Sequence, residues 1–401
     1  DINESSAPNI IIADTIKGKG VSFMEHTSID SDVELYKFHS GAPSADNYFK
    51  GVDELITGLN KLSSKLNFAT VNFEIKTKKS IQNEIITHKL IETYSSALLE
   101  ISNKNKDIVA LDADLILDTG LIPFKKKFPE RFIECGIAEQ DMVSQAGTIS
   151  LSGLLPIVHS FACFLTSRAS EQIYNNCTQD SKVIYVGSLA GLLPAGPGHS
   201  HQALRDVTAM SGMPNLCIIE PSTPDQVYQA LKWAVDKNKY STYIRLTSIP
   251  IKYEFDYNSI NEIQEGCGHL LFNDKNVENT IIVSNPILLN QIIIALNKFG
   301  NRSTFQLIIM PWLNKIDVTW FKDKMSSKSK NVIVFENHYN TFGFGDFIIS
   351  NLAKANLLLN SKCHSLGVDK MPLSGTNEEI LKDFKLDSKS IYETLFKINE
   401  E

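Results

Sequence analysis

Long apolar runs, a signal peptide pattern and closely spaced cysteine pairs are all missing from this sequence. No apolar run reaches the roughly 18–20 residues that a membrane-spanning helix requires, so no membrane partner is expected. The six cysteines are scattered along the chain without a CxxC pair. We therefore expect free thiols in a reducing compartment, which indicates a cytoplasmic protein.

The sequence also contains fewer basic than acidic residues. The chain has 39 Lys and Arg against 46 Asp and Glu, and its formal net charge is -7. This balance argues against nucleic acid or an anionic membrane surface as the main partner. The 43% hydrophobic and 21% charged residues are ordinary for a globular protein, and 401 residues suggest two or three domains. Because the sequence starts at Asp1 rather than Met, a preceding segment is expected.

Short apolar runs alternate with helical patterns through most of the chain. In the middle, a helical pattern over residues 86–101 precedes predicted strands at 108–111, 132–134, 156–158, 183–186, 217–219 and 243–246. Near the end, strands are predicted at 280–283, 306–310 and 332–335, with a helix at 287–298. This alternation predicts parallel sheets with helices on both faces. Earlier in the chain, residues 10–13 read as a buried strand and residues 52–66 as an amphipathic helix.

One carboxylate occupies a position that suits a binding site. The predicted strand 132–134 is followed by a helical pattern that begins near Ile137, which places Glu139 in the first helical turn. The carboxyl ends of strands are where open α/β sheets bind ligands. On position alone, the better interpretation of Glu139 is a first-turn acid that the helix dipole favours.

Three strings resemble the pyrimidine-binding domain of transketolase-type thiamine diphosphate enzymes: GIAEQDM, SFACFLTSRASEQI and GHSHQALRDV. The front of the chain, with PNIIIADTIKGKGVSFME and FHSGAP, is similar to the end of the family's diphosphate-binding domain. FENHYNTFGFG resembles a stretch of its C-terminal domain. The resemblance implies an α/β fold with two doubly wound sheets, preceded by the tail of a third α/β domain. It assigns residues 1–50 to that tail, 51–82 to a linker, 83–252 to the pyrimidine-binding domain and 262–401 to the C-terminal domain.

The resemblance also implies a cofactor site. A glutamate at the position of Glu139 hydrogen-bonds the aminopyrimidine ring in that family and favours its imino tautomer. Phe161 and Phe164 match the aromatic residues that hold this ring, although two phenylalanines at this spacing are by themselves typical of a core. Asp114 matches an aspartate near the cofactor, but a strand-end aspartate is also a common helix cap. Ile137 is expected beside the same ring.

Histidines are implied on the substrate side. His201 follows a loop rich in glycine and proline and matches the histidine of the family's THQ motif, which contacts a substrate oxygen. An imidazole there can act as an acid or a hydrogen-bond donor. His39, in FHSGAP, is expected near the cofactor diphosphate and the substrate hydroxyls. His338 is expected to be structural, because the C-terminal domain of the family mainly supports the dimer.

The family's phosphate-binding pattern is eroded in this sequence. His88 stands in place of an arginine, Asp118 in place of a serine, Leu189 in place of a histidine and Pro197 in place of a substrate-binding aspartate. Arg245 is the cation that remains and is expected to hold a distal substrate group. A phosphate requires several cationic or N–H donors, and an aspartate would repel it. We therefore predict a small sugar-like substrate other than the usual sugar phosphates.

The GDG motif that helps the family hold Mg²⁺ does not occur in these 401 residues. Mg²⁺ prefers carboxylate and amide oxygens that bridge a diphosphate. We therefore expect thiamine diphosphate as the cofactor, with Mg²⁺ ligands outside this chain and none within it. The predicted assembly is a homodimer, or a heteromer with a diphosphate-binding subunit.

The expected reaction is the transfer of a two-carbon ketol unit from a ketose donor to an aldehyde acceptor. One alternative is the β subunit of a 2-oxo acid dehydrogenase, although KGKG and FHSGAP favour a transketolase. Deoxyxylulose phosphate synthase shares the same glutamate and is a second alternative. A non-catalytic regulatory subunit is the third. The eroded phosphate site favours it, and the intact set of Glu139, Phe161, Phe164 and His201 argues against it.

Overall fold

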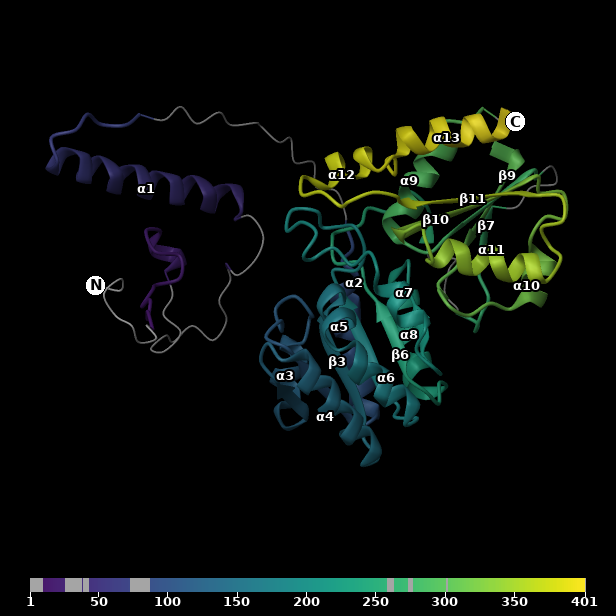
Figure 1. Ribbon diagram of the computed structural model, residues 1–401, viewed down its shortest axis with the longest axis horizontal. Coiled ribbons are helices and arrows are strands. Elements are labelled where there is room, and N and C mark those ends of the chain that lie inside the picture. The colour runs from purple at the N-terminus through teal and green to yellow at the C-terminus, as the bar shows by residue number, and fades with distance from the viewer. Residues whose placement is uncertain are drawn as a thin grey trace, which may run out of the picture. The chain divides into compact units, whose positions relative to one another are not determined.

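The computed structural model describes residues 10–25, 38, 43–72, 87–257, 263–272, 277–300 and 302–400. The chain divides into two compact units, Asp1–Asn83 and Glu84–Glu401 (Figure 1). All six cysteines are free, as predicted. Over the described ranges, no helix is both long and apolar enough to cross a membrane.

The first unit contains a short 3-10 turn, η2 (Ser22–Met24), and one long helix, α1 (Ala45–Lys65). Helix α1 begins before the predicted residue 52 because the Ser44 side chain caps it by accepting a hydrogen bond from the backbone N–H of Asn47. The prediction of a buried strand at residues 10–13 is wrong: Ile10, Ile11 and Ile12 are 87%, 73% and 88% exposed and belong to no strand. A strand requires a neighbour for its N–H and C=O groups, and no described strand pairs with this segment.

The second unit begins with a six-stranded parallel sheet in the order β2-β1-β3-β4-β6-β5. Its strands are β1 (Ile108–Asp112), β2 (Phe132–Glu134), β3 (Leu155–Phe161), β4 (Ile184–Ser188), β5 (Cys217–Ile219) and β6 (Thr242–Arg245). Each lies where the apolar runs predicted a strand. Every residue of β1, β3 and β4 is buried, as a sheet covered on both faces requires.

Helices cover both faces of this sheet (Figure 1). One face carries α2 (Leu90–Lys104), α3 (Ile122–Lys127) and α8 (Pro224–Asp236). The other carries α4 (Glu139–Leu151), α5 (Ala162–Arg168), α6 (Ser170–Thr178) and α7 (Asp206–Ser211). A 3-10 turn, η3 (Pro129–Arg131), leads into β2. Helix α2 begins later than predicted because His88 forms an antiparallel bridge with Ile251, with both N···O distances at 2.8 Å.

A second sheet follows, in the order β11-β10-β8-β9-β7. Its strands are β7 (His269–Phe272), β8 (Asn279–Val283), β9 (Phe305–Ile309), β10 (Asn331–Tyr339) and β11 (Lys362–Val368). Strand β7 is an antiparallel edge, and the other strands are parallel. The associated helices are α9 (Pro286–Leu296), α10 (Val318–Lys324), α11 (Phe344–Lys354), α12 (Asn377–Asp383) and α13 (Ser388–Glu400), with a 3-10 turn η5 (Arg302–Thr304). These two sheets confirm the predicted α/β fold.

A buried carboxylate explains the FENHYNTFGFG string. Glu336, in β10, accepts hydrogen bonds from the backbone N–H of Phe344 at 2.8 Å and of Gly345 at 3.3 Å, and from the Ser365 hydroxyl at 2.9 Å. It thereby binds the amino-terminal end of α11, where the helix dipole favours an anion. Any Cβ at residue 343 would lie 2.0 Å from a Glu336 oxygen, so this position requires Gly343. The string therefore specifies local structure.

The stability of the protein should depend on pH through Glu336. Burial raises its pKa to about 7, and its hydrogen bonds only partly oppose this. Between about pH 4.5 and pH 7 the folded state binds the extra proton, so the free energy of unfolding falls as pH rises. We expect Glu336→Gln to remove up to about 3 kcal/mol of this fall, as measured by urea unfolding across the range.

The exposed Glu393 of α13 provides the control for this prediction. Glu393→Gln should retain the pH slope of the wild type. Equal slopes for the wild type and Glu336→Gln would contradict the assignment.

Candidate functional site

The predicted cofactor residues lie at the carboxyl edge of the first sheet. The chain passes from β1 to β2 on one side of β1, and then crosses to β3 on the other side. Open α/β sheets bind ligands at such a reversal of strand order. Asp114 follows β1, Glu139 begins α4 after β2, and Phe161 ends β3.

Glu139 is a buried carboxylate with an arginine partner. It is only 4% exposed, and its Oε1 lies 2.6 Å from Nη1 of Arg168, the last residue of α5. The same guanidinium covers the ring of Phe164, with Cζ 3.9 Å from the ring centre. Sequence reasoning missed Arg168, although its spacing of four residues from Phe164 on a helix was a usable signal.

Phe161, Phe164 and His201 form one aromatic cluster. Ring centres are 5.6 Å apart for Phe161 and Phe164, 5.1 Å for Phe164 and His201, and 5.8 Å for Phe161 and His201. The His201 Nδ1 lies 2.9 Å from the Ser200 hydroxyl oxygen. The structure therefore brings together side chains that are far apart in sequence. Ile137, two residues before Glu139, is 67% exposed.

A cavity of about 480 Å³ opens beside this cluster. Its lining includes Phe164, Arg168, His199, Ser200 and Gln202. The Gln202 Nε2 donates to two backbone carbonyl oxygens, at 3.1 and 3.2 Å, and this fixes the amide orientation. Its Oε1 is buried and accepts no hydrogen bond from the part of the chain that the structure describes. Gln202, a residue of the cavity lining, therefore has a buried acceptor oxygen.

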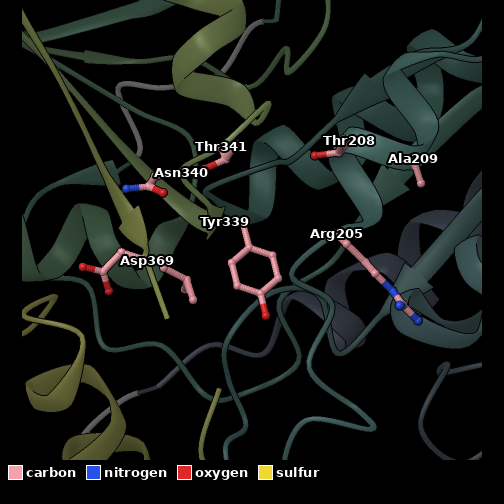
Figure 2. A pocket seen from close by; sticks show the side chains of 8 residues that line it. Arg205, Thr208, Ala209, Tyr339, Asn340, Thr341 and Asp369 are labelled. Atoms are coloured by element: carbon pink, nitrogen blue, oxygen red, sulfur yellow. The ribbon is translucent and has the colours of Figure 1, made fainter. Parts of the chain in front are cut away.

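A neighbouring cavity, also of about 480 Å³, lies between α7 and the ends of β10 and β11. Arg205 and Tyr339 line both cavities. Figure 2 shows Tyr339 near the centre, with Arg205 on one side and Asp369 on the other. None of these residues was predicted as a site residue.

The loop that carries His201 is fixed by the C-terminal part of the chain. The Leu192 N–H donates to Oδ1 of Asn337 at 2.8 Å. The Ala195 N–H donates to Oδ1 of Asn377 at 3.0 Å. Gly191 has a φ of +86°, and a Cβ there would lie 1.8 Å from the Asn337 amide nitrogen. The second sheet therefore positions a loop of the first domain.

Arg245 is enclosed by protein groups. It is 1% exposed, and its Nε and Nη2 donate to the Asp206 carboxylate at 2.8 and 3.2 Å. Nη1 donates to Glu220 at 2.6 Å, and Nη2 also donates to the backbone oxygens of Ala203 and Asn337. Although burial raises it, the charge of Arg245 holds the pKa of Asp206 below its ordinary value. These partners argue against the predicted role of Arg245 in binding substrate.

A third cavity, of about 530 Å³, is lined by residues that stand at the family's phosphate-binding positions. Asp118, Leu189 and Ser248 line it, together with Lys89 and Glu92. Ser248 was missed in the sequence, and its hydroxyl accepts a hydrogen bond from the Leu189 N–H at 2.9 Å.

Other predicted residues have different surroundings. His88 is not part of the third cavity's lining, and its Nε2 lies 3.0 Å from the Tyr257 hydroxyl. Asp114 is exposed, with a φ of +59°, and its N–H donates to Oε1 of Glu134 at 2.8 Å. His338 is 1% exposed, and burial lowers its pKa. His39 lies outside the described residues. Within those residues, no group of three or more His, Cys, Asp or Glu could hold a metal ion.

Two family models match this chain. Residues 88–249 match the pyrimidine-binding domain of transketolase, and residues 274–391 match the transketolase C-terminal domain. Both matches fall on the two sheets of the second unit. The fold is therefore that of a thiamine diphosphate-dependent transketolase-like protein, and the chain belongs to the transketolase family.

Individual relatives agree with this assignment. Transketolase of Homo sapiens is 27% identical over 389 residues, which cover 96% of this chain and 61% of that protein. A putative transketolase C-terminal section of Methanocaldococcus jannaschii is 29% identical and covers 74% of this chain and 92% of its own length. A solved structure titled "Split gene transketolase, inactive beta4 tetramer" has a TM-score of 0.67 at 26% identity, with 77% of this chain and 97% of that chain covered.

The chain spans only about half to three fifths of several longer curated relatives. It covers 60% of transketolase-like protein 2 of Mus musculus, and 48% and 51% of two 1-deoxy-D-xylulose-5-phosphate synthases of Clostridium botulinum. A large part of each of these relatives therefore lies outside the region that matches this chain.

Replacing Arg245 should test its structural role. Arg245→Met would leave Asp206 and Glu220 buried without their cation, so we expect a loss of about 3–5 kcal/mol in the free energy of unfolding. The exposed Arg205 provides the control, because Arg205→Met should change stability by no more than about 0.5 kcal/mol. Urea unfolding of both variants gives the comparison. Equal losses would contradict the importance of the buried cluster.

Proposed function

We propose that this chain supplies the pyrimidine side of a thiamine diphosphate site that transfers a two-carbon ketol unit from a ketose donor to an aldehyde acceptor. The observation that carries the proposal is the buried carboxylate of Glu139 next to the cluster of Phe161, Phe164 and His201. A flat, weakly polar ring is well accommodated by aromatic faces. A carboxylate near its edge can exchange a proton with a ring nitrogen.

The residues fit this cofactor in their chemistry. Arg168 uses Oε1 of Glu139, while a carboxylate has two oxygens that accept hydrogen bonds. When bound, thiamine diphosphate supplies the carbanion chemistry that breaks and forms the carbon–carbon bond. Glu139 would hold or release a proton at the pyrimidine nitrogen, and Asp114 and Ile137 would border the cofactor. The ligands of the diphosphate and of Mg²⁺ are expected outside this chain.

Protons on substrate oxygens are assigned to the histidines. His201 lies against Phe164 and next to the Ser200 hydroxyl, so its imidazole is oriented beside the cavity. It can donate a proton or a hydrogen bond to a substrate oxygen as charge develops there. His39 is proposed to act near the substrate hydroxyls and the cofactor diphosphate.

The substrate is proposed to lack the usual phosphate. In the third cavity, Lys89 is accompanied by the carboxylates of Glu92 and Asp118, and Lys89 pairs with Glu92 at 3.4 Å. This charge balance disfavours a dianion. Because Arg245 is committed to buried carboxylates, Lys89 and Ser248 are the better candidates for contact with a distal hydroxyl group. His88, through its bond to Tyr257, would support the edge of this region.

The active assembly is proposed to be a dimer or a heteromer of this chain that also contains a diphosphate-binding subunit. The partial coverage of the longer relatives supports this, as does the similarity to a relative named as a C-terminal section. The similar split-gene structure is titled an inactive tetramer, which supports a requirement for a further subunit.

Deoxyxylulose phosphate synthase activity is the second candidate. A synthase of Natranaerobius thermophilus is 32% identical over 167 residues, or 42% of this chain. Asp118 in the third cavity argues against it, because that enzyme's named product carries a phosphate.

The proposal predicts cofactor binding only in the complete assembly. Calorimetry should detect tight binding of thiamine diphosphate with Mg²⁺ when a diphosphate-binding subunit is added, and none with this chain alone. Glu139→Gln should lower the rate of ketol transfer by roughly 100- to 10,000-fold, because proton transfer at the ring is lost. The exposed Glu171 of α6 provides the control, and Glu171→Gln should keep full activity. If cofactor binds in neither assembly, the catalytic proposal fails.

Substrate preference should respond to Asp118. Removing this charge with Asp118→Ser should raise kcat/KM for a phosphorylated ketose by about tenfold relative to its unphosphorylated counterpart, because one repulsion is removed. Asp107→Ser, at an exposed loop position, should leave this ratio unchanged. An unchanged ratio in Asp118→Ser would show that the third cavity does not receive the distal end of the substrate.

A further inference from the structure

Arg168 supplies the counter-charge for a carboxylate that is almost out of contact with solvent. Glu139 is 4% exposed, and its Oε1 lies 2.6 Å from Nη1 of Arg168. An ionised carboxylate at this depth requires a hydrogen-bonding partner of opposite charge. Across the described part of the chain, Arg168 is the only residue that forms an ion pair with Glu139.

The same guanidinium also fixes an aromatic ring. Its Cζ lies 3.9 Å from the centre of the Phe164 ring, one helical turn away on α5. Planar guanidinium groups stack on aromatic faces and still donate hydrogen bonds from their edges, which lysine cannot do. The Phe164 ring in turn packs edge-on against His201, with ring centres 5.1 Å apart. Arg168 therefore connects the carboxylate to the aromatic cluster.

The contact to Glu139 uses one oxygen only. No hydrogen bond to Oε2 is seen from the residues that the structure describes. A carboxylate oxygen has two lone pairs, so Oε2 can accept from a ligand while Arg168 remains in place. Phe164 and Arg168 both line the cavity of about 480 Å³ beside His199 and Ser200. A ligand in that cavity would contact the Phe164 ring and the Arg168 guanidinium that stacks on it.

We propose that Arg168 is a positioning residue. It holds Glu139 by one carboxylate oxygen and Phe164 by its ring face, so that Oε2 and the aromatic cluster present one preset surface to a flat nitrogen heterocycle. The identity of that heterocycle as the cofactor's aminopyrimidine rests on the proposed function. The coupling of Glu139, Arg168 and Phe164 does not, so the two can be tested separately.

The first test is a double-mutant cycle with the full chain. Arg168→Met should lower the urea midpoint in the wild type, because Glu139 is left without its partner. In the Glu139→Gln background the same change should cost less than half as much. Arg302→Met is the matched control: Arg302 also lies over a phenylalanine ring, at 4.7 Å, but bonds an amide oxygen. The decrease in the urea midpoint that Arg302→Met causes should be equal in the wild-type and Glu139→Gln backgrounds. Equal costs of Arg168→Met in both backgrounds would overturn the proposal.

The second test separates positioning from general stabilisation. The His201 imidazole resonances report the position of the Phe164 ring, and NMR can follow them in the folded chain. They should shift in Arg168→Met, shift less in Arg168→Lys, which keeps the charge without the planar stack, and stay in place in Arg302→Met. Unchanged resonances in Arg168→Met would overturn the proposal.

A third measurement separates this proposal from the function on which its ligand rests. With a diphosphate-binding subunit present, Arg168→Met should raise the Kd for thiamine diphosphate by roughly tenfold, as expected for a lost charge-assisted contact. If the wild type binds no cofactor but shows the coupling and the His201 shifts, the proposed function fails and the positioning role stands. If the wild type binds cofactor and Arg168→Met binds it equally well, the positioning role fails and the proposed function stands.

Discussion

The guanidinium of Arg245 joins the two sheets of the second unit. It lies at the end of β6, bonds Asp206 and Glu220 from its own domain, and donates to the backbone oxygen of Asn337 in β10. Glu220 continues the network by accepting from Ser284, which follows β8, at 2.6 Å. Charges buried this deeply are stable only when every partner is in place. The relative placement of the two domains is therefore fixed by ionic and polar contacts as well as by apolar packing.

The loop that carries His201 depends on this junction. Asn337, whose backbone accepts from Arg245, uses its side chain to accept from the Leu192 N–H. A disturbance of the junction would therefore reach the candidate site through one residue. Glu139 and Phe161 depend less on the second sheet, because they lie at the ends of local elements of the first. The site thus combines a rigid half, built on the sheet edge, with a half that a neighbouring domain holds in place.

Much of the fold could be predicted from the sequence, because buried parallel strands leave apolar runs that are easily recognised. The place of Glu139 at the start of a helix followed from the strand before it. The prediction of a strand at residues 10–13 was wrong, because an apolar run does not reveal whether a sheet lies beside it. The partners of Arg168 and Arg245 were also beyond reach: Glu139 is 29 positions from Arg168, and Asn337 is 92 positions from Arg245. Spacing indicates which residues share a helix face, but it does not identify contacts between distant elements.

The second sheet has its own reversal of strand order, between β8 and β10. In sheets of this kind that crevice commonly receives a ligand. Here the side chains of Glu220 and Arg245 reach the residues at the ends of those strands, including Asn285 and Asn337. Side chains of the pyrimidine-binding domain thus occupy the position at the C-terminal sheet that a bound ligand would take. Because both domains belong to one chain, the effective concentration of these side chains at the crevice is high, and a diffusible metabolite would have to displace them to bind there.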